Sequence, residues 1–272
     1  MSDPLFDLTG KVIVVTGGLG QLGQQFSGAL IQRGAKVAVL DIAEETTPLP
    51  EGFAAAQKDG CLDYIKANVT DRTSVQNALD RMIDRWGRVD GLINNAALDA
   101  PPNAPVEENG PFETYPEASW DKVMDVNVKG TLIPCQILGG AMAEAGSGSI
   151  INVASIYGMV SPDQGLYEYR RQAGETFYKP VAYSASKSAI YNLTRYMATY
   201  WAGKGVRVNT VTFAGVFNNQ DEAFLEKYCA KVPLGRMANA SEYNGAIIFL
   251  MSEAASYMTG ANMKLDGGFT AW

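Results

Sequence analysis

The chain has 272 residues and a formal net charge of −7, with 47% hydrophobic and 19% charged residues. This length and composition fit one large globular domain with a substantial core. The negative charge argues against nucleic acid or an anionic membrane surface as the main partner. The sequence contains no histidine, which excludes histidine general bases, Ser-His-Asp triads and histidine-ligated metals, so no metal site is expected.

The three cysteines, Cys61, Cys135 and Cys229, are far apart in the sequence. Their odd number and wide spacing favour neither a disulfide framework nor a zinc cluster, and a reducing cytosol is the expected compartment. The sequence has no apolar run long enough to span a bilayer. Its N-terminus is acidic and interrupted by Pro4, so we expect no signal peptide and a cytoplasmic protein.

Residues 11–16 (KVIVVT) are a short, β-branched apolar run, which predicts a strand buried on both faces. A glycine-rich turn follows at 17–23 (GGLGQLG), and a helical pattern then runs to Arg33. A second strand is expected at 35–40. This layout is typical of a dinucleotide-binding βαβ unit, in which glycines let the backbone approach a pyrophosphate at the helix N-terminus. A tight turn that binds nothing is the alternative.

Asp41 stands at the end of the second expected strand. A carboxylate there can accept hydrogen bonds from the adenosine ribose hydroxyls, and it would repel a 2′-phosphate. Ile42 comes next, and the glycine turn contains no Arg or Lys. The sequence therefore predicts NAD(H) over NADP(H), although Arg33 or Lys36 could fold back to offer a compensating charge.

The rest of the chain alternates strands and helices. We expect strands at 64–68, 89–94, 149–154, 206–212 and 262–265, and helices at 71–86, 117–145, 181–203 and 241–251. Residues 48–60 and 98–116 are expected to be loops. The helix at 71–86 has an apolar stripe that predicts its core-facing side, namely Val75, Leu79, Met82, Ile83 and Trp86. The alternation predicts a single α/β domain with a doubly wound, largely parallel sheet and helices on both faces.

Tyr183 and Lys187 stand four residues apart in the helix expected at 181–203, so their side chains lie on one helical face. A phenol alone titrates near ~10 and is a poor acid or base at neutral pH. A fixed ammonium beside it favours the phenolate and lowers that pKa. The pair can then work as a general acid/base near neutral pH, although such pairs also occur on solvated helix faces.

In context, the chain resembles the short-chain dehydrogenase/reductase family over essentially its whole length. The matching pieces, in the family's order, are Thr16-Gly17 with Gly23, Asn94-Asn95-Ala96, Asn127 in VNVKG, Ser155 in NVAS, Tyr183 with Lys187, Arg207-Val208-Asn209, and Gly260 with Asp266-Gly267-Gly268. The resemblance implies a Rossmann fold that uses a nicotinamide nucleotide.

The resemblance also implies a catalytic set of four residues. Tyr183 would donate or accept the substrate proton, and Lys187 would lower the Tyr183 pKa and hold the nicotinamide ribose. Ser155 would hydrogen-bond the substrate oxygen as its charge changes. Asn127 would keep a water in a proton relay behind Lys187. The hydride would pass between the nicotinamide and a substrate carbon.

The NAD site that the resemblance implies is larger. It consists of Gly17, Gln21, Leu22, Asp41, Asn68, Val69, Asn95, Ala96, Ala97, Val216 and Asn218, together with Tyr183 and Lys187. The chain departs from the family's usual pattern at Gln21 and Ala97, where glycine is usual, and at Phe213-Ala214, where Pro-Gly is usual. We expect the glycine turn to form with altered phosphate contacts, and the backbone contacts from Val216 to survive. Asn218 falls where a threonine often contacts the cofactor.

The stretch between Ser155 and Tyr183 is longer than the family usually has. Its extra part, about 161–180 (SPDQGLYEYRRQAGETFYKP), is expected to lie on the substrate side. Arginines and aromatic rings suit a carboxylate, a phosphate or a sugar ring, so Tyr157, Arg170, Arg171 and Tyr178 are the candidate substrate contacts. A solvated lid or an oligomer contact is the alternative for this segment.

The predicted reaction is hydride transfer between NAD(H) and a secondary alcohol or ketone. The turn GGLGQLG and the stretch GVFNNQ are similar to oxidoreductases of bacterial surface-sugar and flagellin-glycan pathways, which implies a polar sugar or sugar-phosphate substrate. A reductase of a β-keto acyl carrier or another ketone stays open. So does a nucleotide-binding regulator without turnover, although the intact Ser155, Tyr183 and Lys187 argue against it.

Assembly is also expected from the resemblance, because family members commonly form dimers or tetramers through the long helices and the C-terminal strand. In this chain those helices are the ones expected at 117–145 and 181–203. The C-terminus carries Phe269 and Trp272, aromatic groups that are poorly placed in water. A homo-oligomer, such as a homotetramer, is therefore expected.

Overall fold

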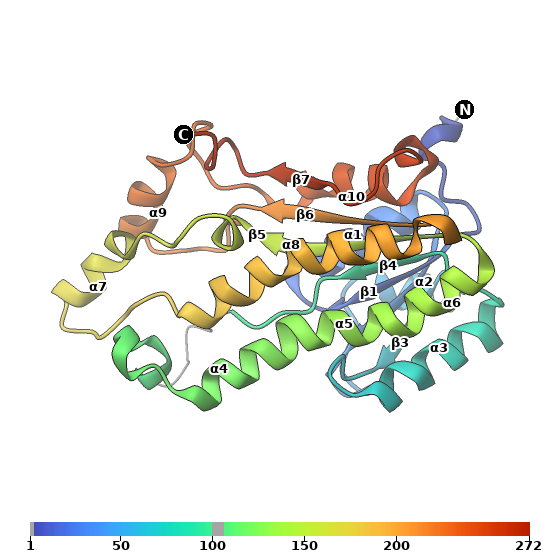
Figure 1. Cartoon of the computed structure of the whole chain (residues 1–272), viewed down its shortest axis with the longest axis horizontal. Coiled ribbons are helices and arrows are strands. Elements are labelled where there is room, and N and C mark those ends of the chain that lie inside the picture. Colours follow the sequence, from blue (N-terminus) through green and yellow to red (C-terminus); the bar gives the residue numbers. More distant parts are fainter. Residues whose placement is uncertain (1–2, 100–105) are drawn as a thin grey trace.

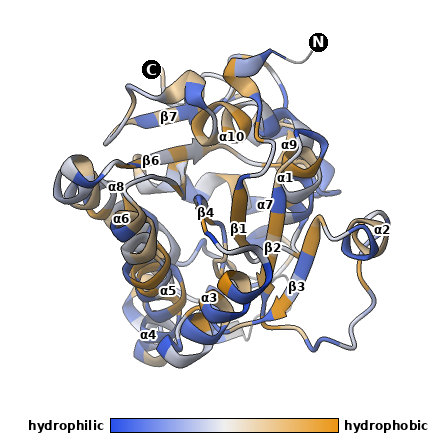
Figure 2. Ribbon diagram, turned by 90° about the vertical axis from the view of Figure 1, so that its right-hand side faces the viewer, coloured by the Kyte–Doolittle hydropathy of each residue, from blue (hydrophilic) through white to orange (hydrophobic). Residues whose placement is uncertain are grey.

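The computed structural model describes residues 3–99 and 106–272. In this part of the chain, seven strands form one sheet in the order β3-β2-β1-β4-β5-β6-β7 (Figures 1 and 2). Every neighbouring pair is parallel. The strands are β1 (Val12–Thr16), β2 (Lys36–Asp41), β3 (Leu62–Lys66), β4 (Gly91–Asn94), β5 (Gly148–Ser155), β6 (Val206–Phe213) and β7 (Asn262–Leu265).

The strand order reverses between β1 and β4. From β1 the chain builds the sheet outward through β2 and β3, and it then returns to place β4 on the other side of β1. The loops that leave these two strands diverge, which opens a crevice beyond their carboxyl ends. This switch point is where a doubly wound sheet binds its ligand.

Helices cover both faces of the sheet (Figure 2). One face buries apolar side chains of the helices between residues 72 and 145 and of α8, and the other buries side chains of α1, α2 and α10. The helices are α1 (Gln21–Gln32), α2 (Phe53–Lys58), α3 (Arg72–Trp86), α4 (Glu117–Met124), α5 (Gly130–Pro134), α6 (Gly140–Ala145), α7 (Glu168–Gln172), α8 (Val181–Trp201), α9 (Glu222–Cys229) and α10 (Asn244–Met251). The predicted doubly wound fold is confirmed.

Several local predictions were wrong. Residues 48–60 are not wholly irregular, because the alanine-rich α2 forms there and buries Phe53 against the sheet. The helix α9 was not expected at all. In α3, Val75, Leu79 and Met82 are buried as predicted, but 42% of the Ile83 surface is exposed. The α3 stripe is therefore narrower than its sequence suggested.

The helical run expected at 117–145 is continuous, but it is not a uniform α-helix. Two π-helical turns, Asp125–Lys129 and Cys135–Gly139, separate α4, α5 and α6. In the first of them, the Gly130 amide donates to the carbonyl of Asp125, five residues earlier. Such turns recur at functional positions, and this one contains Asn127.

The loop expected at 98–116 lies partly outside the described residues. Within the described part it contains two short 3₁₀ turns, Val106–Asn109 and Phe112–Thr114. The strand expected at 64–68 begins and ends two residues earlier, so Asn68 and Val69 follow β3 instead of lying in it. Among the described helices, none is both long and apolar enough to cross a bilayer.

Candidate active site

A cavity of about 700 Å³ lies beyond the carboxyl ends of β4, β5 and β6. These strands point toward the end of the molecule where α7 and α9 project past the sheet (Figure 1), and residues of both helices line the cavity. Of the predicted site residues, the cavity wall contains Leu22, Asn95, Ala97, Ser155, Tyr157, Arg170, Tyr183, Lys187, Val216 and Asn218. Residues distant in the sequence therefore converge beyond the carboxyl ends of the strands.

The glycine turn forms as expected despite Gln21. The Gly20 amide donates to the Gly17 carbonyl at 3.2 Å, and α1 begins directly afterwards. A Cβ at Gly23 would lie 2.3 Å from the Gly17 oxygen, so only glycine allows this approach. No side chain caps the N-terminus of α1, which leaves its first amides for a pyrophosphate.

The Gln21 side chain takes a structural contact, since its Nε2 donates to the Phe217 carbonyl at 3.0 Å. This bond joins the glycine turn to residues 216–220. In that segment, the Gln220 side chain accepts from the Asn218 amide and donates to the Val216 carbonyl, both at 2.8 Å. Val216 and Asn218 are thus held beside Leu22 on one wall of the cavity.

Asn95 joins the end of β4 to the end of β1 through hydrogen bonds. Its Nδ2 donates to the carbonyls of Thr16 and Gly17, while the Thr16 hydroxyl accepts from the amides of Asn95 and Ala96, all at 3.1 Å. A Cβ at Gly17, where φ is +61°, would lie 2.8 Å from the Ala96 Cα. The side chains of Asn95 and Thr16, together with the close backbone approach at Gly17, therefore define this part of the cofactor side.

Asp41 ends β2 with its carboxylate turned to the glycine turn. The Leu19 amide donates to one carboxylate oxygen at 3.0 Å, and the Ile42 amide donates to the other at 2.8 Å. These two bonds fix the carboxylate where the resemblance places the adenosine ribose. The glycine turn, the uncapped helix and this carboxylate together fit a nicotinamide dinucleotide.

Asn68 and Val69 follow β3 and are not among the described residues that line the cavity. The Asn68 Oδ1 accepts from the Thr70 amide and hydroxyl, which forms a local turn. Val69 is buried, and a Cβ at Gly130 would lie 2.7 Å from its Cγ2. The cofactor role of these two residues stays a prediction.

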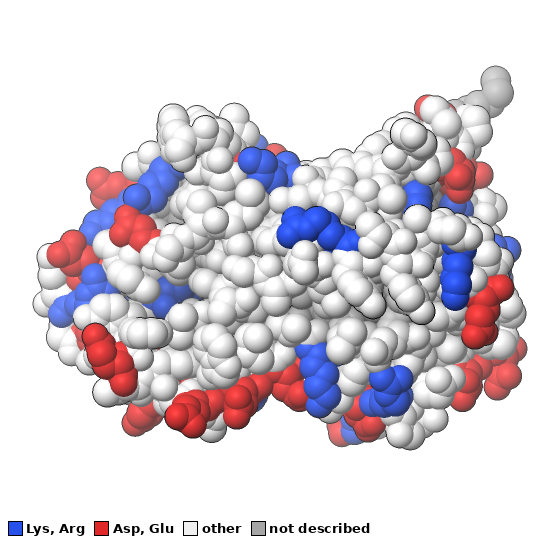
Figure 3. Space-filling view, in the orientation of Figure 1, with Lys and Arg blue, Asp and Glu red and all other residues white. Residues whose placement is uncertain are grey.

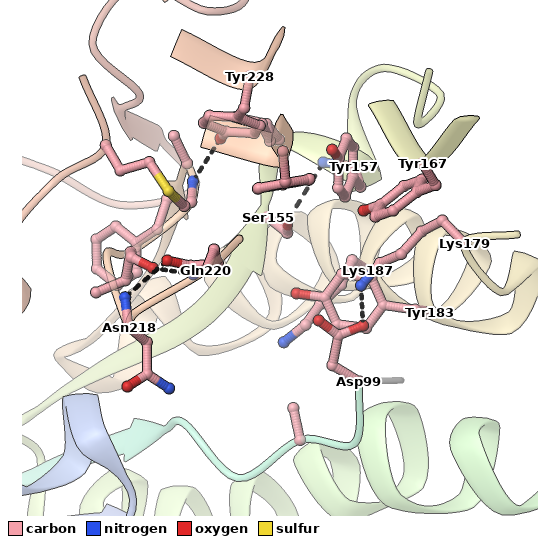
Figure 4. Close-up of a pocket in the computed structure, with 18 of the residues that line it drawn as sticks. Asp99, Ser155, Tyr157, Tyr167, Lys179, Tyr183, Lys187, Asn218, Gln220 and Tyr228 are labelled. Carbon is pink, nitrogen blue, oxygen red and sulfur yellow. Dashed lines mark hydrogen bonds and ion pairs between the residues drawn. The ribbon is translucent and has the colours of Figure 1, made fainter. Parts of the chain in front are cut away.

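Ser155, Tyr183 and Lys187 meet in the middle of the cavity (Figure 4). Ser155 ends β5, and its hydroxyl accepts from the Tyr157 amide at 3.2 Å. Tyr183 and Lys187 come from the first turns of α8. The Lys187 ammonium donates to the Val153 carbonyl at 2.8 Å and lies 5.9 Å from the centre of the Tyr183 ring.

The pKa shifts differ from the prediction for this pair. The pKa of Tyr183 is raised, first because the phenol is buried and then because Asp99 is nearby, while Ser155 opposes the shift. Burial lowers the pKa of Lys187 to about 8. Lys187 is desolvated and bonded to a carbonyl, so it does not produce the expected drop in the Tyr183 pKa.

Asn127 is almost fully buried behind the cavity. Its amide exchanges two hydrogen bonds with the backbone of Leu98, at 2.7 and 2.9 Å. It also donates to the Ser186 hydroxyl at 2.9 Å. Asn127 therefore links the segment after β4 to α8 next to Lys187, and its proposed part in a proton relay stays a prediction.

The four predicted substrate contacts separate into two groups. Tyr157 and Arg170 line the cavity, whereas Arg171 and Tyr178 are not among its described lining residues. The Arg171 guanidinium donates to the carbonyls of Phe177 and Gln164 and lies over the Tyr178 ring. Arg171 thus holds the 161–180 segment together, while the Arg170 guanidinium pairs with Glu175.

Other cavity residues were not predicted as site residues. Lys179 pairs with Asp99, and Tyr228 of α9 accepts from the Gly215 amide at 2.6 Å. Figure 4 shows Asp99 and Lys179 meeting beside Tyr183, with Tyr157 and Tyr167 above Ser155. The only sequence signal for Asp99 was its place four residues after Asn95, and α9 gave none.

Comparisons with known proteins agree with this geometry. The family model described as "Enoyl-(Acyl carrier protein) reductase" matches residues 21–270. D-threitol dehydrogenase of Mycolicibacterium smegmatis is 33% identical, over 97% of this chain and 95% of that protein.

Two solved structures are also similar. A short-chain dehydrogenase from Leptospira borgpetersenii with bound NAD+ has a TM-score of 0.84 and 30% identity, covering 99% of this chain and 96% of that one. A gluconate 5-dehydrogenase from Burkholderia cenocepacia, in complex with NADP and tartrate, has a TM-score of 0.83 and 25% identity, covering 99% and 98%. The chain therefore belongs to the short-chain dehydrogenase/reductase family, and it is an oxidoreductase that interconverts a secondary alcohol and a ketone with a nicotinamide dinucleotide.

Proposed function

We propose that the protein is an NAD(H)-dependent dehydrogenase of a small, polar, hydroxyl-rich alcohol. The observation that carries this proposal is the polar wall facing Ser155 and Tyr183, to which Asp99, Lys179 and Tyr157 contribute. Such a wall suits a substrate with several hydroxyl groups. The relative named for D-threitol and the solved structure named for gluconate give independent support.

In this proposal the substrate hydroxyl lies between the Ser155 hydroxyl and the Tyr183 phenol. During oxidation Tyr183 takes the hydroxyl proton, and Ser155 hydrogen-bonds the oxygen as it becomes a carbonyl. The nicotinamide, when bound, accepts the hydride from the carbon. Lys187 supplies positive charge beside the phenol, and Asn127 holds the segment after β4 against α8.

The preference for NAD(H) over NADP(H) is part of the proposal. It is supported by Asp41, whose carboxylate is fixed by the Leu19 and Ile42 amides at the end of β2. Arg33 and Lys36, the cations considered as a counter-charge for a 2′-phosphate, lie at or before the start of β2, at the opposite end of the strand from Asp41. One similar solved structure contains NAD+ and another contains NADP. The proposed preference for NAD(H) therefore rests on the Asp41 carboxylate and not on these structures.

We also propose that the chain assembles into a homo-oligomer through its outer helices. Tyr196 and Tyr200 stack at 6.0 Å on the outer side of α8, and both are more than 60% exposed. The middle of the face in Figure 3 carries few charged side chains, whereas its rim carries many. Light scattering that shows only monomer at micromolar concentration would contradict this proposal.

A β-keto acyl carrier substrate is the second candidate, and it is favoured by a relative that is 30% identical over 96% of this chain, the 3-oxoacyl-[acyl-carrier-protein] reductase of Thermotoga maritima. It predicts activity on an acetoacetyl thioester. The two candidates are separated by measuring cofactor turnover with a polyol, a simple secondary alcohol and that thioester. Faster turnover of the thioester than of every alcohol would overturn the polar-alcohol proposal.

A further inference from the structure

The cavity contains an ion pair that the general reaction of an alcohol dehydrogenase does not require. Lys179, at the end of the 161–180 segment, pairs with Asp99, which follows β4. Both side chains line the cavity. The Lys179 ammonium lies 4.9 Å from the centre of the Tyr183 ring, so the pair stands directly beside the proposed proton donor (Figure 4).

This pair is accessible from the cavity through its acidic member. The Lys179 side chain is 9% exposed, but the Asp99 side chain is 51% exposed. A carboxylate offers about four lone-pair sites and an ammonium offers three donors, so both groups can bind a hydroxyl while they remain paired. Hydrogen bonds to charged groups are about twice as strong as those between neutral groups.

A third polar group faces the same space. The Tyr157 hydroxyl is buried and makes no hydrogen bond of standard geometry among the described residues; its close polar neighbour is the Tyr167 hydroxyl, which helps to raise the Tyr157 pKa (Figure 4). Only 9% of the Tyr157 surface is exposed. A buried hydroxyl without a partner is costly, and a ligand hydroxyl in the cavity would supply the missing bond.

The charges around the cavity determine what kind of substrate fits. Each cation that lines the described cavity already has a partner: Arg170 pairs with Glu175, Lys179 pairs with Asp99, and the Lys187 ammonium donates to the Val153 carbonyl. Asp221 accepts a hydrogen bond from the Tyr169 hydroxyl at 2.6 Å. Arg170 and Lys179 are neutralised by carboxylates and the Lys187 ammonium is buried, so a substrate carboxylate or phosphate would find no exposed cation without a counter-charge and would approach the Asp99 carboxylate.

We infer that Asp99, Lys179 and Tyr157 form a hydroxyl-recognition subsite, and that it selects an uncharged polyol over a simple alcohol and over a sugar acid or sugar phosphate. A hydroxyl next to the reacting carbon donates to Asp99 and accepts from Lys179, while a further hydroxyl bonds Tyr157. This inference rests on the proposed function, and it narrows the polar substrate to uncharged members. Asp99 and Lys179 are thus the specificity-determining residues of the site.

The test measures kcat/KM for NAD+ reduction with three probes: a hexitol such as sorbitol, butan-2-ol, and gluconate. We expect the unmodified protein to favour the hexitol over each of the other two by at least about tenfold, because sites built to bind a hydroxyl discriminate strongly against analogues without it. Higher kcat/KM for gluconate than for the hexitol would overturn the charge argument.

Two variants should change kcat/KM for gluconate, the charged probe, in opposite directions. Asp99→Asn keeps the shape of the side chain but removes its negative charge. The ratio of kcat/KM for the hexitol to kcat/KM for butan-2-ol should therefore fall about tenfold, and kcat/KM for gluconate should rise relative to that for the hexitol. Lys179→Met leaves Asp99 without its counter-charge, so kcat/KM for gluconate should fall further relative to that for the hexitol. If both variants lower kcat/KM for all three probes by one common factor, the pair has only a structural role.

A third variant and a control complete the design. Tyr157→Phe should lower kcat/KM for the hexitol several-fold with little change in the melting temperature, because the lost hydroxyl makes no hydrogen bond of standard geometry within the described residues. The control is Lys231→Met, which removes the ion pair between Lys231 and Asp163 of the 161–180 segment. It should leave the ratios of kcat/KM among the three probes unchanged. The subsite would be overturned if the ratio of kcat/KM for the hexitol to that for butan-2-ol were unchanged in all three variants, Asp99→Asn, Lys179→Met and Tyr157→Phe.

The same probes separate failure of this inference from failure of the proposed function. Turnover of butan-2-ol without a preference for the hexitol would overturn the subsite and leave the dehydrogenase activity in place. Absence of turnover with every secondary alcohol would overturn the proposed function, and the subsite with it.

Discussion

The two sides of the active-site cavity are held in place by different interactions. The cofactor wall, residues 16–23 and 94–97, is fixed by hydrogen bonds from the Asn95 side chain to the backbone and by glycines packed so tightly against other backbone atoms that a Cβ would clash. The substrate wall, residues 157–180 and 215–231, depends on contacts between side chains. Lys227 and Lys231 of the second segment form ion pairs with Glu168 and Asp163 of the first.

An aromatic cluster joins the two segments of the substrate wall from within. Tyr167 contacts both Phe177 and Phe224, and Phe224 stacks on Tyr228. Side chains can be exchanged without disturbing the sheet, whereas a backbone that touches another backbone cannot change without moving it. The cofactor wall is therefore constrained by the fold, and the substrate wall is where relatives can diverge in specificity.

The largest expected effect is that of replacing Tyr183, which lines the cavity together with residues of both walls. Tyr183→Phe removes the proposed proton donor and should reduce turnover by about a hundredfold to ten-thousandfold. Cofactor affinity, measured by fluorescence titration, should change little because both walls are intact. Tyr196→Phe, on the exposed side of the same helix, is the matched control. Substantial residual activity in Tyr183→Phe would remove this residue from the mechanism.

The next effect tests Asp41, the side chain that we propose selects the cofactor. Asp41→Ala should relax the preference for NAD(H), because a 2′-phosphate beside an unpaired carboxylate costs on the order of 1–3 kcal/mol, about tenfold to a hundredfold in affinity. Titration of both nucleotides against the wild-type and variant proteins measures the change. Equal or tighter binding of NADP(H) by the wild-type protein would show that Asp41 does not select the cofactor.

The tight packing of the cofactor wall can be broken at a single glycine. Gly23→Ala would place a Cβ 2.3 Å from the Gly17 oxygen, so the turn must shift. We expect a loss of about 1–3 kcal/mol in the free energy of unfolding and weaker NAD(H) binding. Gly28→Ala, on the same helix, meets no atom within 4 Å and should stabilise the protein slightly. Equal stability of the two variants would contradict this account of the wall.

A smaller effect concerns pH. The pKa of Tyr183 is raised by burial and by Asp99, so the phenolate needed for oxidation becomes more abundant as pH rises. The protonated phenol needed for reduction is already present at neutral pH. We expect kcat/KM for oxidation to increase through the alkaline range, and Asp99→Asn to move that increase to lower pH. An unshifted profile would show that Asp99 does not act on Tyr183.

The smallest effect is expected on the surface of the substrate wall. Replacing both Lys227 and Lys231 by Met removes two exposed ion pairs, each worth about 0.5 kcal/mol. KM should rise by no more than about fivefold, and equally for all substrates. The wild-type protein should show the same trend in high salt. An unchanged KM would mean that the aromatic cluster alone holds this wall.

This contrast also explains what the sequence could predict. The glycine turn, Asp41, Ser155 and the Tyr183–Lys187 pair are local patterns whose spacing carries their meaning, and the structure brings them together at the switch point. The Asp99–Lys179 pair joins residues 80 positions apart. Neither residue belongs to a motif, and each was one of many charged residues, so only the folded chain reveals their contact.

Some predictions failed because tertiary packing overrode local pattern. Ile83 continues the apolar stripe of α3 but lies beyond the edge of the surface that the sheet covers. Arg171 suited an anionic ligand by type, yet its donors are used by two carbonyls within its own segment. The raised pKa of Tyr183 depends on how deeply the phenol is buried, which helical spacing does not indicate.

The π-helical turn at Asp125–Lys129 sets where Asn127 stands relative to the rest of its helix. One extra residue in a regular α-helix would rotate everything beyond it by about 100°, since a turn holds 3.6 residues, but a π-helical turn absorbs it. The wide turn lets Asn127 face α8 while Ile133, farther along, still packs in the core under the sheet. Deleting a single residue here would restore an ordinary α-helical turn, so that the apolar residues beyond it keep their places while Asn127 loses the position from which it bonds Leu98 and Ser186.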